Sequence, residues 1–186
     1  MIYDEIMKTQ QAFTLIELMI AVAVVAILAM VALPNMRHML INNRMTSKTN
    51  DFISAINYAR TEAITNTNRN LQIQPSDYPN NEDWSNGWQI VDDSSDNGWQ
   101  TVDDDEILKI FEYNGDKIMI KQTDGECSTN NPSICYKARG RIQTSYTFQI
   151  CSEEHQSAKV LTIGRIGRVR TVSCSLGETP CPNTCS

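Results

Sequence analysis

The stretch FTLIELMIAVAVVAILAMVAL, residues 13–33, decides the class of this chain. It contains no Gly, no Pro and a single charged residue, Glu17. As a helix rising 1.5 Å per residue it spans about 31 Å, the thickness of a bilayer's hydrocarbon core. A buried core helix normally has a polar face. A secretory signal has a shorter apolar run behind a basic start, whereas residues 1–12 carry a net charge of −1. We therefore predict a retained transmembrane helix.

Glu17 is the unusual residue of this helix. A carboxylate near the end of a membrane helix costs about 2–3 kcal/mol to insert, so it needs a compensating partner. A free α-amino group at Phe13, created by cleavage between Ala12 and Phe13, would supply a positive charge close by. Such a cut would give Glu17 the partner that it needs.

These residues carry a resemblance to a known family. The segment AFTLIELMIAVAVVAILAMVALP, residues 12–34, resembles the class III signal of type IV pilins and type II secretion pseudopilins. In that family a prepilin peptidase removes a short leader on the cytoplasmic side, the new N-terminal Phe is methylated, and the Glu pairs with a neighbouring subunit's N-terminus. The resemblance implies cleavage between Ala12 and Phe13, methylation of Phe13, assembly through Glu17 and a helix kink at Pro34. Ala12 stands where the family usually has Gly.

An amphipathic helix is expected to continue over residues 34–68. One face collects Met45, Phe52, Ile56, Ala59 and Ala63, whose spacings of 7, 4, 3 and 4 follow a helical period. The charged residues Arg44, Lys48, Asp51, Arg60 and Glu62 are expected mostly elsewhere. The helix should end near Asn66, Asn68 and Asn70, which have poor helix propensity. Residues 55–64, AINYARTEAI, resemble the helix end of the minor-pilin group FimT and of its type II secretion relative GspH.

Residues 69–186 predict an antiparallel β domain, because short alternating runs are bounded by Gly, Asn, Asp and Pro. The candidate strands are 71–74, 87–91, 107–113, 117–121, 147–151, 158–163 and 169–173. We expect an α+β fold in which the helix packs on the sheet, the order found in pilins. Residues 1–12 would be the leader, 13–33 the membrane helix, and 69–186 a periplasmic globular domain.

An acidic segment with a local duplication interrupts the β region. NGWQIVDD at 86–93 recurs as NGWQTVDD at 97–104, and we expect the two copies to form a hairpin in which each strand presents a Trp. The aspartates of this segment also suggest calcium, but their spacing does not match an EF-hand loop. We therefore favour a solvated acidic loop. The aspartates are Asp92, Asp93, Asp96 and Asp103 to Asp105.

The six cysteines all lie in the last 60 residues, in the part expected outside the cytoplasm. Their even number there suggests disulfides in an oxidising periplasm. Zinc is the alternative, but no C-x₂-C pair occurs and neither His is placed for a metal site, so we expect no metal or other cofactor. From spacing we expect three bridges: Cys127–Cys135, Cys151–Cys174 and Cys181–Cys185.

Charge is distributed unevenly along the chain. The net charge of −6 and pI near 4.9 argue against a protein that coats nucleic acid non-specifically. Residues 77–126, however, have 14 acidic and 3 basic side chains, while residues 127–186 have 3 acidic and 7 basic ones. The acidic total therefore conceals a basic C-terminal region.

The basic segment GRIGRVR, residues 164–170, carries Arg165, Arg168 and Arg170 and lies near Lys159. It could be a strand edge whose arginines discourage edge pairing. Alternatively, its guanidiniums contact successive phosphates of double-stranded DNA. Residues 167–170 resemble the GRxR motif of FimT proteins, a group implicated in DNA binding during natural transformation. Lys137, Arg139 and Arg141 could extend the patch.

The resemblance implies a minor pilin of a type IV pilus, held in the inner membrane and assembled with other pilin subunits. The alternative is a type II secretion minor pseudopilin, which has no reason to bind DNA. A membrane-anchored periplasmic enzyme has little support, because no nucleophile, base and orienting acid can be assembled from the sequence. We expect the chain not to be an enzyme.

Overall fold

A computed structural model describes residues 13–66, 69–78, 83–93, 106–113, 117–127, 132–152 and 155–181. One long helix precedes a β-rich region, which confirms the predicted α+β class. The elements are α1 (Leu15–Thr65), β1 (Leu71–Pro75), a short 3₁₀ helix η1 (Trp84–Asn86), β2 (Gly87–Asp92), β3 (Glu106–Glu112), β4 (Ile118–Asp124), β5 (Ile134–Lys137), β6 (Arg141–Ile142), β7 (Tyr146–Ser152), β8 (His155–Ile163) and β9 (Val169–Ser175).

The chain divides into two compact units, of which the first ends at Leu40. Its described part is helical from Leu15, and Thr14 caps the helix by accepting the Glu17 amide at 3.4 Å through Oγ1 and the Leu18 amide at 3.2 Å through its carbonyl. The large apolar side chains that are described in this unit are exposed, from Phe13 at 82% to Leu40 at 48%. Within the described residues, no helical stretch meets both the length and the hydropathy required of a membrane span.

The second unit begins at Ile41 and contains the hydrophobic core. All five residues predicted on the apolar face of the helix are buried to 1% exposure or less: Met45, Phe52, Ile56, Ala59 and Ala63. The helix ends at Thr65, directly before the expected asparagine cluster. The second half of α1 is therefore the amphipathic helix that the spacing predicted.

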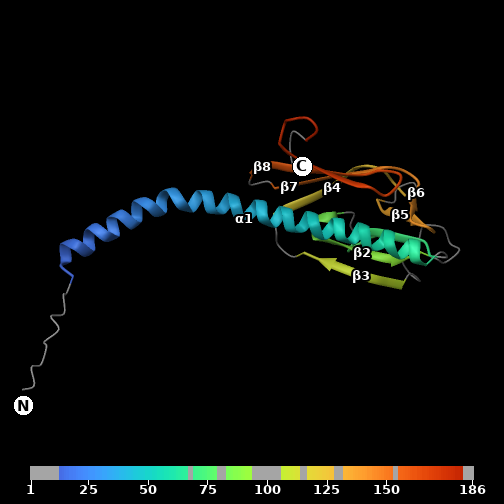
Figure 1. The fold of residues 1–186 in the computed structure, drawn as a ribbon, viewed down its shortest axis with the longest axis horizontal. Helices are drawn as coiled ribbons and strands as arrows, with labels where there is room; N and C mark the ends of the chain where they lie inside the picture. Colours follow the sequence, from blue (N-terminus) through green and yellow to red (C-terminus); the bar gives the residue numbers. More distant parts are fainter. Residues whose placement is uncertain are drawn as a thin grey trace, which may run out of the picture. The chain divides into compact units, whose positions relative to one another are not determined.

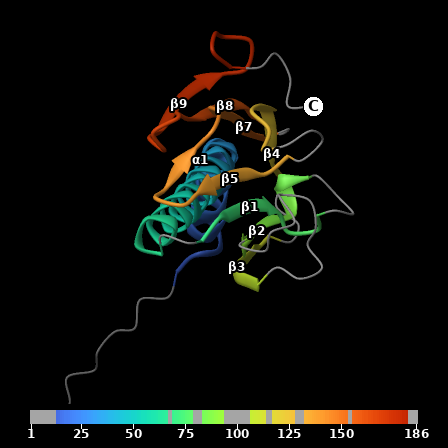
Figure 2. The ribbon, with the colours of Figure 1, turned by 90° about the vertical axis from the view of Figure 1, so that its right-hand side faces the viewer.

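Two antiparallel sheets pack against this half of α1. The five-stranded sheet has the order β3-β2-β1-β5-β6 and the four-stranded sheet the order β4-β7-β8-β9. Figure 1 shows α1 crossing both sheets, and Figure 2 shows them from the end of the helix. Phe52 joins them, because its ring centroid lies 4.8 Å from that of Trp88 on β2 and 4.9 Å from that of Phe148 on β7. One helical side chain thus contacts both layers.

All seven candidate strands are present, and their ends differ from the predicted ends by up to three residues. Strands β5 and β6 were not predicted. The expected hairpin between the two NGWQ copies is wrong. Both edges of β2 are occupied, one by β1 and the other by β3, so the first copy has no free edge to offer. The second copy, residues 97–104, lies outside the described residues.

Lys48 was expected outside the apolar face, and that expectation is also wrong. Its side chain is 1% exposed. The ammonium donates to the carbonyl of Ser85 at 2.7 Å and to that of Ile118 at 2.9 Å, and it lies 4.8 Å from the ring centroid of Tyr113. Since Ser85 precedes β2 and Ile118 begins β4, this one ammonium ties the helix to both sheets. Burial of a charge is tolerated here because carbonyl groups and an aromatic face surround it.

We predict that Lys48→Ala lowers the free energy of unfolding by about 3 kcal/mol, because it leaves a cavity and two buried carbonyls without this donor. Arg44→Ala, an exposed truncation one turn earlier on α1, is the control and should change stability by less than about 0.5 kcal/mol. Chemical denaturation of the purified full chain in detergent measures both. Equal stability of the two variants would contradict the role given to Lys48.

Candidate nucleic-acid interface

A groove of about 1120 Å³ opens where the end of α1 meets two turns of the chain. One wall is the turn between β5 and β6, and the other is the turn between β8 and β9. The lining includes five basic residues from three separate segments: Arg60, Lys137, Arg139, Arg141 and Arg165. The structure thus brings Arg165 together with the three residues that sequence analysis proposed as an extension, and it adds Arg60.

The β8–β9 turn is closed by two backbone hydrogen bonds. The Gly167 amide donates to the Gly164 carbonyl at 2.7 Å, and the Gly164 amide donates to the Arg168 carbonyl at 3.0 Å. Gly167 has φ of 73°, and a Cβ placed on it would lie 2.9 Å from Nε of Arg60. The turn therefore needs glycine for its conformation and for its close approach to α1.

The β5–β6 turn is attached to the same end of α1. Arg139 donates its amide to the Ala63 carbonyl at 2.9 Å, which satisfies one of the free carbonyls at the helix C-terminus. Arg139 has φ of 70° and is the one non-glycine residue with positive φ among the described residues. A Cβ on the next residue, Gly140, would lie 2.6 Å from Cγ1 of Ile64. The turn is held tightly against the helix.

Arg60 lies between the two turns. Its Nε atom is buried and has no hydrogen-bond partner in the described structure. Burial raises the pKa of Tyr136, and the positive charge of Arg60 opposes that rise. The other four basic side chains of the groove are exposed.

None of the five basic side chains forms an ion pair with a carboxylate of the described residues. Arg69, which does not line the groove, instead lies 3.0 Å from a carboxylate oxygen of Asp92, 3.7 Å from one of Glu62 and 3.8 Å from one of Glu106. Nor is any described residue lining the groove acidic. As far as the described residues go, the groove therefore carries positive charge with no carboxylate in its lining, which suits a polyanion.

The remaining predicted DNA-binding residues lie elsewhere. Arg170 pairs with Thr162 across the β8–β9 ladder, whereas the adjacent Val169 packs against the core. Because strand residues alternate between faces, Arg170 belongs to the outer face, and neither Arg170 nor the exposed Arg168 is among the described residues that line the groove. Residues 164–170, which we call the arginine loop, are thus divided between two surfaces.

Lys159 was grouped with the arginine loop, and the structure separates them. Its ammonium donates to Oγ1 of Thr46 at 2.8 Å, and desolvation lowers the pKa of Lys159. Thr46 and Arg60 are 14 positions apart on α1, which corresponds to about 21 Å along the axis. Lys159 therefore lies toward the opposite end of the domain.

The N-terminal site residues are only partly described. Ala12 lies outside the described residues, Phe13 is 82% exposed, and Glu17 lies in the first turn of α1. The T-x-x-E pattern of residues 14–17 is a helix-start signal that the sequence analysis passed over. The helix continues through Pro34, and the kink there stays a prediction.

The sequence raised zinc and calcium as possible ligands. The described residues contain no group of three or more His, Cys, Asp or Glu side chains placed to hold an ion. Asp93 instead accepts a hydrogen bond from Nε2 of Gln72 at 2.9 Å, and Asp92 pairs with Arg69. The other aspartates of the calcium interpretation, Asp96 and Asp103 to Asp105, lie outside the described residues.

Two protein-family models match this chain and identify its family. Residues 48–167 match the model of type II transport protein GspH, and residues 7–33 match the prokaryotic N-terminal methylation motif. The chain belongs to the GspH family. It is therefore a pilin-like subunit, a minor pilin or pseudopilin of a type IV pilus or a type II secretion system.

Solved structures resemble this GspH-family protein in fold. The type IV minor pilin FimU of Pseudomonas aeruginosa aligns with a TM-score of 0.50 and 21% identity, over 76% of this chain and 99% of FimU. The minor pseudopilin EpsH from the type 2 secretion system of Vibrio cholerae aligns with a TM-score of 0.48 and 16% identity, over 72% of this chain and 98% of EpsH. No curated protein matches the sequence significantly.

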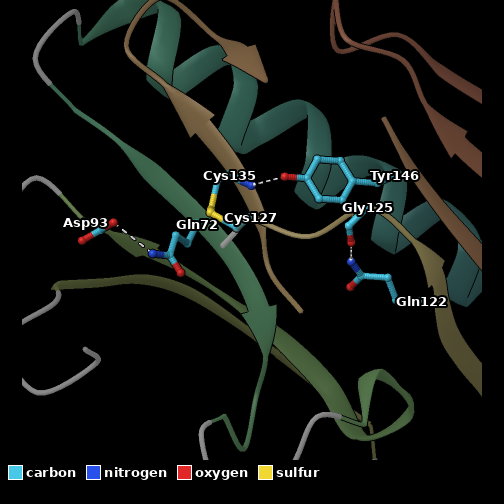
Figure 3. The surroundings of a disulfide bond; sticks show 7 residues. All are labelled: Gln72, Asp93, Gln122, Gly125, Cys127, Cys135 and Tyr146. Carbon is cyan, nitrogen blue, oxygen red and sulfur yellow. Dashed lines mark hydrogen bonds between the residues drawn. A yellow bond between two sulfur atoms is a disulfide. The ribbon is translucent and has the colours of Figure 1, made fainter. Parts of the chain in front are cut away.

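Two disulfides of this GspH-family protein are described. Cys127–Cys135 was predicted correctly, and Figure 3 shows the Cys135 amide beside it donating to the Tyr146 hydroxyl at 3.2 Å. The second bridge joins Cys174 and Cys181. The predicted pairs Cys151–Cys174 and Cys181–Cys185 are therefore wrong. Cys151 is also disulfide-bonded, and Cys185 lies outside the described residues.

The pairing of Cys174 with Cys181 has a structural reason. Cys174 pairs with Ala158 across the β8–β9 ladder, near the end of β9. Two backbone bonds then turn the tail back: the Glu178 amide donates to the Ser175 carbonyl at 3.2 Å, and the Cys181 amide donates to the Glu178 carbonyl at 2.6 Å. These turns return Cys181 to within 6.0 Å of Cys174, measured between Cα atoms.

We predict that Gly167→Ala lowers the free energy of unfolding by about 1–2 kcal/mol, because alanine is strained at positive φ and its Cβ would displace Arg60. Gly164→Ala is the matched control. The nearest heavy atom to a Cβ there is 3.9 Å away, so the change should cost less than about 0.5 kcal/mol. Thermal unfolding of the two variants measures the difference, and equal midpoints would show that the turn tolerates a side chain.

Proposed function

We propose that this chain is a minor pilin of a type IV pilus that captures DNA for natural transformation. In this proposal prepilin peptidase removes residues 1–12, Phe13 is methylated, and residues 13–33 hold the subunit in the inner membrane before assembly. Glu17 pairs with the N-terminus of a neighbouring subunit, and the globular domain is periplasmic. Catalysis and cofactors have no part in it.

The position of Arg165 is the main support for the proposed DNA binding. It lies in a groove with four other basic side chains and no acidic partner among the described residues. The contacts available to a guanidinium on phosphate are strong and bidentate. They carry no sequence information, so we expect sequence-tolerant binding that weakens as salt is raised and is weak for one subunit.

We predict that changing Arg165, Arg168 and Arg170 together to Gln weakens binding to duplex DNA by at least about tenfold at low salt, because phosphate contacts are lost. Electrophoretic mobility shifts with the full chain in a non-ionic detergent measure this, and transformation frequency measures the consequence in cells. Unchanged mobility shifts and unchanged transformation would refute the DNA-binding function. They would leave the pilin assignment intact.

The proposed cleavage and methylation of the N-terminus can be tested separately. We predict that the protein isolated from cells begins at Phe13 and carries one added methyl group on its α-nitrogen, as read by mass spectrometry of the N-terminal peptide. Cells that lack prepilin peptidase should retain residues 1–12. A mature chain that still begins at Met1 in peptidase-containing cells would contradict this assignment.

The second candidate is a minor pseudopilin of a type II secretion system, which the description of the matching family favours. The two differ in what a deletion removes. Loss of exoprotein secretion with intact pili and transformation would favour the pseudopilin, whereas loss of transformation with intact secretion would favour the minor pilin.

A further inference from the structure

We propose that the β5–β6 turn and Arg60 form the second wall of the DNA site, so that the phosphates of one duplex strand run between Arg165 on one side and Arg139 and Arg141 on the other. This inference rests on the proposed DNA-binding function. It moves the centre of the site from the arginine loop to the groove at the end of α1.

The conformation of Arg139 is the first reason. A non-glycine residue with positive φ is uncommon, and such strain concentrates at functional sites. Glycine or asparagine would adopt this conformation more easily, and an arginine at this position forms no described ion pair. Its backbone amide is fixed to Ala63 at 2.9 Å, so the guanidinium is presented from a turn that cannot easily relax away from the groove.

The unpaired Nε of Arg60 is the second reason. It is buried, lacks a described hydrogen-bond partner, and lies beneath the β8–β9 turn at Gly167. A buried donor without an acceptor costs free energy. Nε itself is covered by the turn, but Arg60 also lines the groove, so an anionic oxygen there could accept from the terminal nitrogens of its guanidinium. Arg60 would then both support the turn and contact the ligand.

The lining also indicates which nucleic acid fits. Proteins that bind single strands stack bases on aromatic side chains, and none of the described lining residues is aromatic. The lining offers guanidiniums, an ammonium, the amides Asn70 and Gln143, and aliphatic groups. Binding would therefore depend on phosphate, with no base stacking to favour a single strand. We assign the groove to duplex DNA.

The test compares three variants of the full chain in a non-ionic detergent, using the fluorescence anisotropy of one labelled duplex at several salt concentrations. The groove variant combines Arg139→Asn, which keeps a residue that tolerates positive φ, with Arg141→Gln. The loop variant combines Arg168→Gln with Arg170→Gln. The control combines Arg44→Gln with Lys121→Gln, two exposed cations outside the groove. All three lose two positive charges.

We expect the groove variant to bind the duplex at least about fivefold more weakly than the wild type. The slope of log K against log salt should become less steep by nearly two, because each phosphate contact contributes about 0.9 to that slope. The control should stay within about twofold of the wild type. Arg141→Gln alone, which leaves the strained turn residue in place, should lose part of the affinity. Unfolding midpoints of all variants confirm that the domain is folded.

Three results would overturn the inference in distinguishable ways. If the loop variant loses affinity while the groove variant matches the control, the second wall is wrong and the proposed function survives. If the wild type fails to bind the duplex, the proposed function itself fails. If an equally long single strand binds as tightly as the duplex, the assignment to duplex DNA is wrong.

Discussion

The buried stripe of α1 is the surface on which the rest of the domain depends. Two sheets whose described strands share no hydrogen-bonded ladder are joined because both pack on it. Phe52 contributes the apolar part of the junction and Lys48 the polar part, through carbonyls on either side. An apolar residue could fill the volume of Lys48, but it could not donate to those two carbonyls. The charged residue therefore fixes the relative position of the sheets in a way that hydrophobic burial alone does not.

The end of α1 explains where the groove forms. Each of the two turns approaches it closely with a glycine, Gly140 against Ile64 and Gly167 against Arg60. The basic residues meet because backbone packing at the end of the helix positions their turns. Charge attraction could not gather them, since like charges repel.

The sequence predicted those features that depend on local periodicity. The helical face from Met45 to Ala63 and seven of the nine described strands could be inferred because burial imposes a period on nearby residues. Lys48 could not be placed, because its partners Ser85 and Ile118 are 37 and 70 positions away. Arg60 was missed for the same reason. Its contact at the β8–β9 turn, Gly167, lies far away in the sequence.

The distribution of charge reconciles an acidic protein with a basic groove. At physiological salt, fields from exposed charges fall off within about 8 Å, so the net charge of −6 does not determine what a local surface attracts. Asp92 and Glu106, both from the acidic segment, are engaged by Arg69 rather than by the groove. The groove residues are mostly exposed, so water screens their repulsion. The C-terminus of α1, where Arg139 donates to Ala63, contributes a partial negative charge that favours cations nearby. Repulsion among the five basic side chains is thus reduced without a carboxylate from the described lining, which leaves them available to an external anion.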